Sequence, residues 1–567
     1  MDILLAKIRP KETTKAIETV KDLLDDNPTA DIIFDFKTHA HAAEIGQSVI
    51  QDLSLEEGGV TWNAINKTHL DGGAILLRQI IETPITDPTL IAARQTAITE
   101  LTTRPAITTQ LAHLKELEAD VLWTQNTPDI KKTWPIPLIF PTWPVLSYIN
   151  YSRHALGAYH IYRCVIAPLM SAATPISSAL GPYFYLKYKL KLNIALVFYI
   201  KMLIALVLQA NYSTFAYLIV IGYIALYAYG IFCNIESALM IYNLRNSLYK
   251  KALAIKDFIT TSRNLIATIG PQLVSKISGA FLGDANTKIF TGDIVGSMTD
   301  IYQYWTNPTK REEMRTLIKV IYAIDVCFNA TTLVNNYLWT ITTIGPTCII
   351  YDMKHPALKS QVGNPASLKK SLIVTGPNAA GKSTYVKALL CNVLLSQTLG
   401  IAYAARMETP IWESIHSYMR IWDTPGEESL FEAEMARCRQ VLERAAAAEA
   451  AGRRAIFFLD EPMHSTPPIE GAATAKAMVK HLASMDGIRV VVTTHFHTII
   501  DLPLNLARNV SMEAIPLASE KGFKFPYKIR KGGSRQCIAL ELLKEHDLPE
   551  AVIADAIKFK NIICENK

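Results

Sequence analysis

The fold is decided by the stretch Ser371-Leu-Ile-Val-Thr375 and the residues after it, Gly376-Pro-Asn-Ala-Ala-Gly381-Lys382-Ser383-Thr384. The first five residues are apolar and rich in β-branched side chains, which predicts a strand, and residues 385–398 are typical of a helix. The pattern GxxxxGK[ST] between a strand and a helix is typical of a phosphate-binding loop. Its glycines let backbone N–H groups approach phosphate oxygens, and the helix N-terminus adds partial positive charge. A chance glycine turn before a helix is the alternative. The predicted nucleotide-binding residues are Gly376, Pro377, Asn378, Ala379, Ala380, Gly381, Lys382, Ser383 and Thr384.

An acidic pair follows a second apolar run, Ala455-Ile-Phe-Phe-Leu459. Such a pair is weak evidence by itself, because surface strands also end in acids, but together with the loop it predicts ATP and Mg²⁺ as ligands. We expect Ser383 to ligate the metal directly and Asp460 to bind it through water. We expect Lys382 to reach the β- and γ-phosphates and Glu461 to orient the attacking water.

A third apolar run, Ile488-Arg-Val-Val-Val492, ends in Thr493-Thr-His495-Phe-His497. If this strand lies beside the other two, a histidine falls where the γ-phosphate would be. His495 is the predicted sensor, and a core histidine is the alternative for His497. The predicted catalytic residues of this ATPase are therefore Glu461, Lys382 and His495.

The composition indicates an intracellular protein with an apolar excess. Half of the 567 residues are hydrophobic and only 19% are charged. Eight cysteines occur without a CxxC pair, which argues against a zinc ribbon or a disulfide framework. The N-terminal residues lack the apolar core of a secretory signal, so no export is predicted.

The middle of the chain is both basic and apolar. Residues 130–260 hold twelve Lys and Arg against two acids. Residues 193–209 are nearly all apolar, and residues 215–233 carry no charge over nineteen positions, which is about 30 Å of helix. The two segments predict a candidate transmembrane hairpin, and the basic residues on both outer flanks place both of its ends in the cytoplasm. A buried hairpin is the alternative, because Lys201 would be costly in mid-bilayer.

The motif-bearing residues resemble the MutS family of DNA mismatch-repair ATPases. Residues 375–384 are similar to the family's TGPN-x-x-GKST, and residues 494–497 to its THxH switch. Gln397 is placed where the family has a magnesium-contacting glutamine, so the resemblance adds it to the metal residues. Residues 429–435 are similar to the family's ST-F-x-x-E-M segment, whose serine approaches the ATP of the opposite subunit. The resemblance therefore implies a homodimer in which Ser429 binds ATP in trans.

The resemblance is fainter upstream and has departures. Residues 69–78 and 317–335 are similar to the family's helical core and lever helices. The residues before this core are too few for the family's mismatch-reading domain, so we expect no direct mismatch reading. The loop Pro462-Met-His-Ser-Thr-Pro-Pro468 lacks the family's glycine-rich character.

The expected fold class is α + α/β, a helical core and lever domain followed by an ABC-type ATPase domain with a phosphate-binding loop. The predicted parts are a helical core region at 1–130, a basic hydrophobic insertion at 131–250, lever-like helices at 251–350, the ATPase domain at 351–525 and dimerisation helices at 526–567.

Two functions are compatible with these features. The first is a MutS-like homodimeric ATPase in DNA repair or another DNA transaction, with non-specific phosphate contacts from the basic region. The second is a membrane-anchored ATPase switch or tether, attached through residues 193–233, whose basic residues meet anionic lipid. Two lipid-length helices serve an anchor but not a DNA-binding ring, so extraction of membranes with carbonate separates the two.

Overall fold

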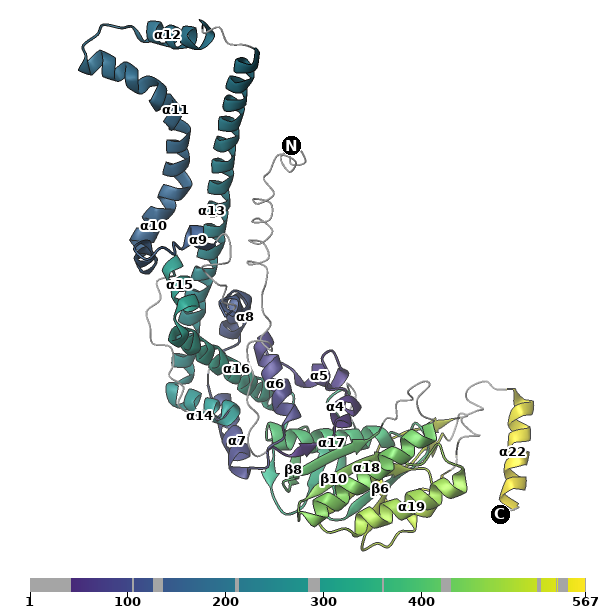
Figure 1. The fold of residues 1–567 in the computed structure, drawn as a ribbon. Coiled ribbons are helices and arrows are strands. Elements are labelled where there is room, and N and C mark those ends of the chain that lie inside the picture. Colours follow the sequence, from purple (N-terminus) through teal and green to yellow (C-terminus); the bar gives the residue numbers. More distant parts are fainter. Residues whose placement is uncertain are drawn as a thin grey trace. The chain divides into compact units, whose positions relative to one another are not determined.

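The computed structural model describes residues 42–104, 107–125, 136–209, 214–283, 296–358, 362–419, 430–517, 522–536, 538 and 549–565. Within these ranges the chain forms two compact units (Figure 1). One unit contains residues 113–264 and 296–317. The other contains residues 42–112, 265–283 and 318–565. The five parts predicted from the sequence remain predictions.

The second unit is built on a seven-stranded sheet in the order β1-β9-β10-β11-β6-β12-β15 (Figure 1). All neighbouring strands are parallel except the last pair, β12 and β15. The three strands predicted from the sequence are present as β6 (Ser371–Thr375), β10 (Ala455–Asp460) and β11 (Ile488–Thr494). β11 lies between the other two, so the condition for placing His495 near the loop is met. The other strands are β1 (Glu44–Ile45), β9 (Ser414–Tyr418), β12 (Ala507–Met512) and β15 (Ile529–Lys531).

Helices α17 (Lys382–Thr398), α18 (Leu430–Ala450) and α19 (Pro468–Ser484) pack against this sheet. Apolar side chains of α18 and α19 form one buried core with alternate residues of β10 and β11, among them Phe457 and Val490. The central strands are buried on both faces, as expected for parallel strands covered by helices. The carboxyl ends of β6, β10 and β11 therefore meet at one edge, where loops can form a site.

A smaller sheet combines three strands that precede the phosphate-binding loop in the sequence with one, Arg406–Thr409, that follows it. It contains β3 (Thr343–Ile344), β8 (Arg406–Thr409), β4 (Ile349–Met353) and β5 (Asn364–Ser367) in that order. β5 leads through a short turn into β6. The small sheet thus brings residues 353–355, Leu358, Val362 and Asn364 beside the start of α17, where they line a cavity described below.

A buried carboxylate joins two helical segments of the second unit. Asp325, on α16 (Pro308–Asn336), accepts hydrogen bonds from the backbone N–H groups of His69 at 3.0 Å and Leu70 at 2.9 Å. These residues directly precede α6 (Asp71–Glu82). A Cβ on Gly73 would lie 2.3 Å from the Asp325 carboxylate, so only glycine permits this approach. The two segments that resemble the MutS core and levers therefore pack together.

The first unit contains a long helical pair. One member is nearly continuous through α10 (Arg153–Ile161), the π-helical turn η2 (Tyr162–Ile166), α11 (Ala167–Phe184) and the π-helical turn η3 (Tyr185–Lys189). The other is α13 (Thr214–Ile269), of 56 residues. Tyr227 on α13 donates to Ala172 O at 2.8 Å, and the Asn234 amide donates to Ser171 Oγ at 2.8 Å. α11 and α13 are therefore neighbours, with α12 (Leu196–Gln209) at the outer end of the pair (Figure 1).

The candidate membrane hairpin corresponds to α12 and the start of α13. Its connection, residues 210–213, and the side chains of 203–220 lie outside the described residues. Among the described residues, two helical segments are long and apolar enough to cross a membrane: Ile224–Ile269, only 17% buried in its apolar window, and Pro308–Asn336, 78% buried. The second is a core helix of the kind found in soluble proteins. A span by 193–233 remains a prediction.

Candidate nucleotide-binding site

The loop between β6 and α17 requires glycine at both ends. Gly376 has φ +142°, and a Cβ there would lie 2.1 Å from the backbone oxygen of Met512. Gly381 has φ +95°. Both conformations are strained for any side chain, and the neighbouring strand β12 blocks one of them sterically. The fold therefore demands the glycines as strongly as phosphate binding does.

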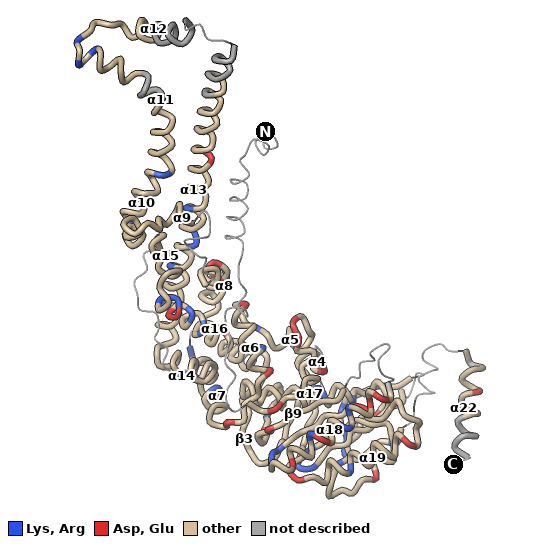
Figure 2. The backbone as a smooth tube through the Cα atoms, in the orientation of Figure 1, with Lys and Arg blue, Asp and Glu red and all other residues tan. Residues whose placement is uncertain are grey.

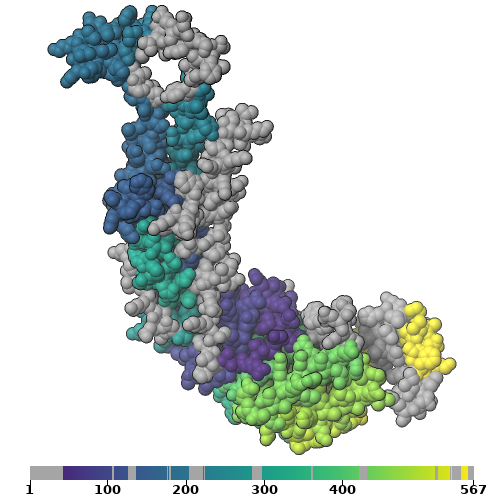
Figure 3. Space-filling model, viewed as in Figure 1, coloured from purple at the N-terminus to yellow at the C-terminus, as the bar shows by residue number. Residues whose placement is uncertain are grey.

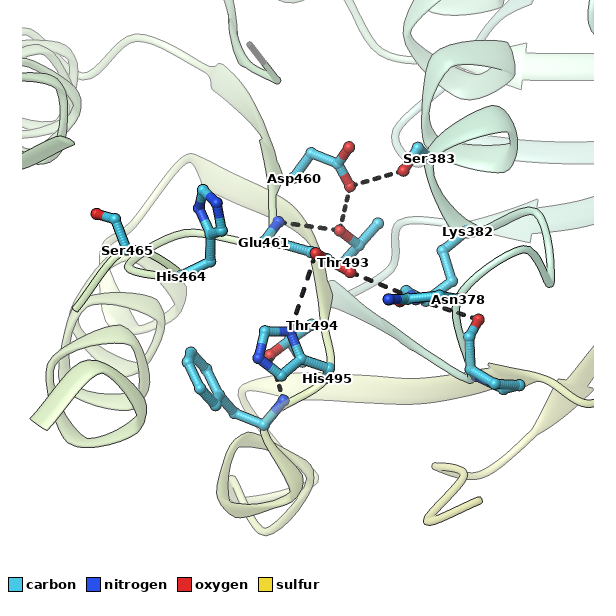
Figure 4. Close-up of polar contacts among 12 residues, drawn as sticks. Asn378, Lys382, Ser383, Asp460, Glu461, His464, Ser465, Thr493, Thr494 and His495 are labelled. Atoms are coloured by element: carbon cyan, nitrogen blue, oxygen red, sulfur yellow. Dashed lines mark hydrogen bonds and ion pairs between the residues drawn. The ribbon is translucent and has the colours of Figure 1, made fainter. Parts of the chain in front are cut away.

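Lys382 is inside this loop and only 5% exposed. Its ammonium donates to Gly376 O at 3.0 Å, Pro377 O at 3.3 Å and Asn378 Oδ1 at 3.3 Å. It also lies 3.4 Å from Glu461 Oε1 (Figure 4). These oxygens hold the cation at the mouth of the loop, where phosphate oxygens could replace some of them.

Ser383 and Asp460 supply oxygen ligands suited to Mg²⁺. Ser383 Oγ donates to Asp460 Oδ1 at 3.1 Å, and the Thr493 hydroxyl donates to the same oxygen (Figure 4). Serine comes from the first turn of α17 and the aspartate from the end of β10, so two separate elements converge on one point. An alcohol beside a carboxylate fits a cation with hard oxygen ligands.

Glu461 is held in place by its backbone. Its φ is +49°, an uncommon value for a residue other than glycine, and its N–H donates to Thr493 O at 3.1 Å and Thr493 Oγ1 at 3.0 Å. The carboxylate lies between Lys382 and His495, with His495 Nδ1 at 3.9 Å from Glu461 Oε2 (Figure 4). The side chain is 30% exposed, so water can reach it.

The surroundings of His495 favour its neutral form. Burial lowers the pKa of the imidazole below its ordinary value; the Glu461 carboxylate raises it, and the charges of Lys382 and two other histidines lower it. A neutral imidazole can donate one hydrogen bond and accept another. His497 is exposed, so it is not the core histidine considered as its alternative.

Two cavities meet at the loop. One, of about 880 Å³, is lined by Asn378, Ala379, residues 381–385, Asp460, Glu461 and residues from the small sheet and β12. The other, of about 450 Å³, is lined by residues 375–378, Glu461, His464 and residues 494–497. Ala380 is buried beneath the loop. The structure thus brings together the predicted phosphate-loop residues with Asp460, Glu461 and His495.

A histidine that the sequence analysis did not assign lines the larger cavity. Burial, with a smaller contribution from Lys387, lowers the pKa of His355 to about 4. Its Nδ1 accepts a hydrogen bond from Ala357 N at 3.2 Å. His355 is therefore neutral at physiological pH and offers a flat ring at the cavity wall.

The prediction that Gln397 contacts the metal is wrong, because Gln397 lies far from Ser383 in this structure. Gln397 and Ser383 lie at opposite ends of α17, and fourteen residues of helix span about 21 Å. The Gln397 amide is fully buried: it donates to Trp412 O at 2.8 Å and Ile85 O at 3.2 Å, and accepts from Trp412 N at 2.7 Å. Gln397 thus joins the C-terminal end of α17 to the backbone of Ile85 and Trp412.

Ser429 lies outside the described residues, so its trans role remains a prediction. Glu434, five residues later on α18, is a functional candidate that the sequence analysis left without a role. Its buried carboxylate accepts from His464 N at 3.0 Å, from Ser465 N at 3.2 Å and from the Ser465 hydroxyl. Met463 in the same loop has φ +65°. Glu434 therefore holds the loop that directly follows β10 and Glu461.

Comparison with known proteins shows what the C-terminal part of the chain is similar to. The family model described as MutS domain V matches residues 372–563. The chain is 23% identical to a DNA mismatch repair protein MutS of Streptococcus pyogenes serotype M1 over 257 residues, which cover 43% of this chain and 29% of the relative. It is 29% identical to the mitochondrial DNA mismatch repair protein MSH1 of Arabidopsis thaliana over 197 residues, or 34% and 17% of the two chains. The chain thus matches less than a third of the length of either relative. Over this C-terminal part, the chain is therefore similar to the MutS family.

Proposed function

We propose that the chain is a Mg²⁺-dependent ATPase. The observation that carries the proposal is the convergence of Lys382, Glu461 and the Ser383–Asp460 pair at one sheet edge. Lys382 would stabilise charge on the transferred phosphoryl group, and Glu461 would orient the attacking water. Ser383 and Asp460 would hold Mg²⁺, which neutralises phosphate charge when bound. His495 would contact the γ-phosphate.

The direct test is steady-state phosphate release from ATP by the purified full-length chain. We expect release in the presence of Mg²⁺ and its loss on addition of a chelator, since Ser383 and Asp460 alone offer no positive charge. Asp460→Asn should show a greater Mg²⁺ requirement than the wild type. If the rate of phosphate release is the same with and without Mg²⁺, the assignment of Ser383 and Asp460 to the metal is contradicted.

The proposed assembly is a homodimer in which Ser429 reaches the ATP of the partner subunit. The support is the resemblance of residues 429–435 to the family's signature segment and the family match of the C-terminal part. Residues 526–567 are the proposed dimerisation segment. Glu434 would then link this signature segment to the loop after Glu461 within each subunit.

The proposed setting is an intracellular DNA transaction without direct mismatch reading. Both relatives are named as DNA mismatch repair proteins. Basic residues of the first unit would contact DNA phosphates. Lys251 is not among them, because its ammonium pairs with Asp120 at 2.9 Å and lies over the ring of Trp123.

We expect equal affinity for matched and mismatched duplexes, because contacts to phosphate carry no sequence information. The affinity should fall steeply with salt. A competition binding assay on the two duplexes at two salt concentrations measures both. A mismatch preference above about tenfold, or ~1.4 kcal/mol, would contradict the proposal.

A membrane-associated ATPase is the second candidate, with attachment through residues 193–233 and both ends in the cytoplasm. The specific observation in its favour is the exposure of large apolar side chains along the first unit, among them Leu169, Val197, Phe198 and Leu226. Exposed apolar surface on this scale marks an interaction site.

A further inference from the structure

The outer end of the first unit carries an apolar surface with a basic rim. We call it the tip surface, formed by η3, the following turn and the described part of α12. Val197, Phe198 and Tyr188 are 66%, 65% and 70% exposed. Lys187, Lys189 and Lys191 lie beside them in the sequence, and no acidic residue occurs between residues 130 and 235 (Figure 2). Part of this surface is visible in the space-filling view (Figure 3).

Side-chain packing holds the tip surface in place. Tyr199 is only 3% exposed and its ring lies 5.3 Å from that of Tyr183, which fixes α12 against the end of α11. Lys187 lies 5.5 Å from the ring of Tyr183 and donates to its hydroxyl at 3.2 Å. The neighbouring side chains of Phe198 and Ile200 are exposed.

We propose that the tip surface docks in the plane of an anionic lipid bilayer. This inference rests on the membrane candidate and specifies its ligand and geometry. Aliphatic and aromatic side chains would enter the boundary between headgroups and acyl chains, tyrosines prefer that boundary, and lysines would meet anionic headgroups.

Docking in the plane fits better than a span. α12 has 14 residues, or about 21 Å, which is shorter than a hydrocarbon core of about 30 Å. Lys201 lies within α12 and is exposed, which is costly in mid-bilayer but favourable at an interface.

Lipid also fits better than DNA. Contacts to DNA phosphates use basic and polar side chains and leave no partner for exposed Val197 and Phe198. Charge attracts this surface to either polyanion, but only the bilayer offers an apolar phase for its aliphatic side chains.

The test is flotation of the full-length chain with vesicles of phosphatidylcholine, with and without phosphatidylserine. We expect binding to the anionic vesicles and release by high salt or alkaline carbonate. Val197→Asp should weaken binding about tenfold or more, because an exposed apolar side chain that enters lipid is replaced by a charge. Val60→Asp is the matched control, since Val60 is also 66% exposed but belongs to the second unit. Changing Lys187, Lys189 and Lys191 to Gln should weaken binding to the anionic vesicles about a hundredfold.

Several outcomes would overturn the inference: no flotation with anionic vesicles, equal flotation of Val197→Asp and the wild type, or resistance to carbonate, which would indicate a spanning hairpin. Loss of DNA affinity in Val197→Asp without loss of vesicle binding would assign the surface to DNA. Phosphate release by every variant is measured without vesicles. It should be unchanged, so a failure of the ATPase proposal is seen separately.

Discussion

Replacing Glu461 with glutamine is expected to lower ATP turnover by about 100- to 10,000-fold while ATP still binds. Glutamine keeps the size of the side chain but cannot accept a proton or polarise water as a carboxylate does. The backbone at this position should keep its conformation, because the residue's backbone N–H, and not its side chain, bonds to Thr493. Single-turnover phosphate release and equilibrium binding of labelled ATP measure the two effects separately.

Lys382→Ala should also abolish turnover, but with loss of ATP affinity, because the ammonium contacts phosphate in both the ground state and the transition state. Glu470→Gln, an exposed glutamate on α19, is the matched control and should have wild-type rates. Turnover near the wild-type rate in either site variant would contradict the assignment of Glu461 and Lys382.

Asp325→Ala is expected to destabilise the second unit by roughly 2–5 kcal/mol, because it leaves the N–H groups of His69 and Leu70 without their acceptor. Asp325 is fully buried, so water does not readily replace the carboxylate. Asp325→Asn keeps one oxygen acceptor and should therefore lower the free energy of unfolding by less. Equilibrium urea unfolding followed by circular dichroism measures the change.

Glu82→Ala is the control for this experiment. Glu82 forms an exposed ion pair with Arg78 on the same helix, and such pairs contribute at most about 1 kcal/mol. If Asp325→Ala lowers the free energy of unfolding no more than Glu82→Ala does, the buried carboxylate does not join α16 to α6.

The geometry of the candidate nucleotide site could largely be predicted because its signals are local. The glycines, Lys382 and Ser383 lie within nine consecutive residues, and their conformation follows from a strand, a tight turn and a helix. The acids of the second strand needed one more step, the adjacency of parallel strands, which the apolar runs indicated. The order of β10, β11 and β6 then placed His495 near Glu461.

Features that depend on distant contacts were not accessible in this way. Glu434 meets a loop about thirty residues later, and nothing in the residues around it indicates that partner. Gln397 was matched to a family position by sequence alone, whereas the rise of α17 carries it away from the metal. Near Tyr227 and Asn234 the neighbour of α13 is α11, over fifty residues earlier, and the apolar pattern could not distinguish it from α12.

Because hydrogen bonds hold the C-terminal end of α17, this helix is a rigid connection between the phosphate-binding loop and the helical residues of the second unit, or a strut. Its first turn holds Lys382 and Ser383, and its last carbonyl, that of Thr398, accepts a hydrogen bond from the buried Arg94, whose pKa burial lowers to about 9. Arg94 also donates to Ala280 O at 2.9 Å, so the strut ends on two helical segments from other parts of the chain. A helix of seventeen residues is about 25 Å long and shortens little under load. A displacement of the first turn of α17 along the helix axis would therefore reach the segments around Arg94 and Ala280.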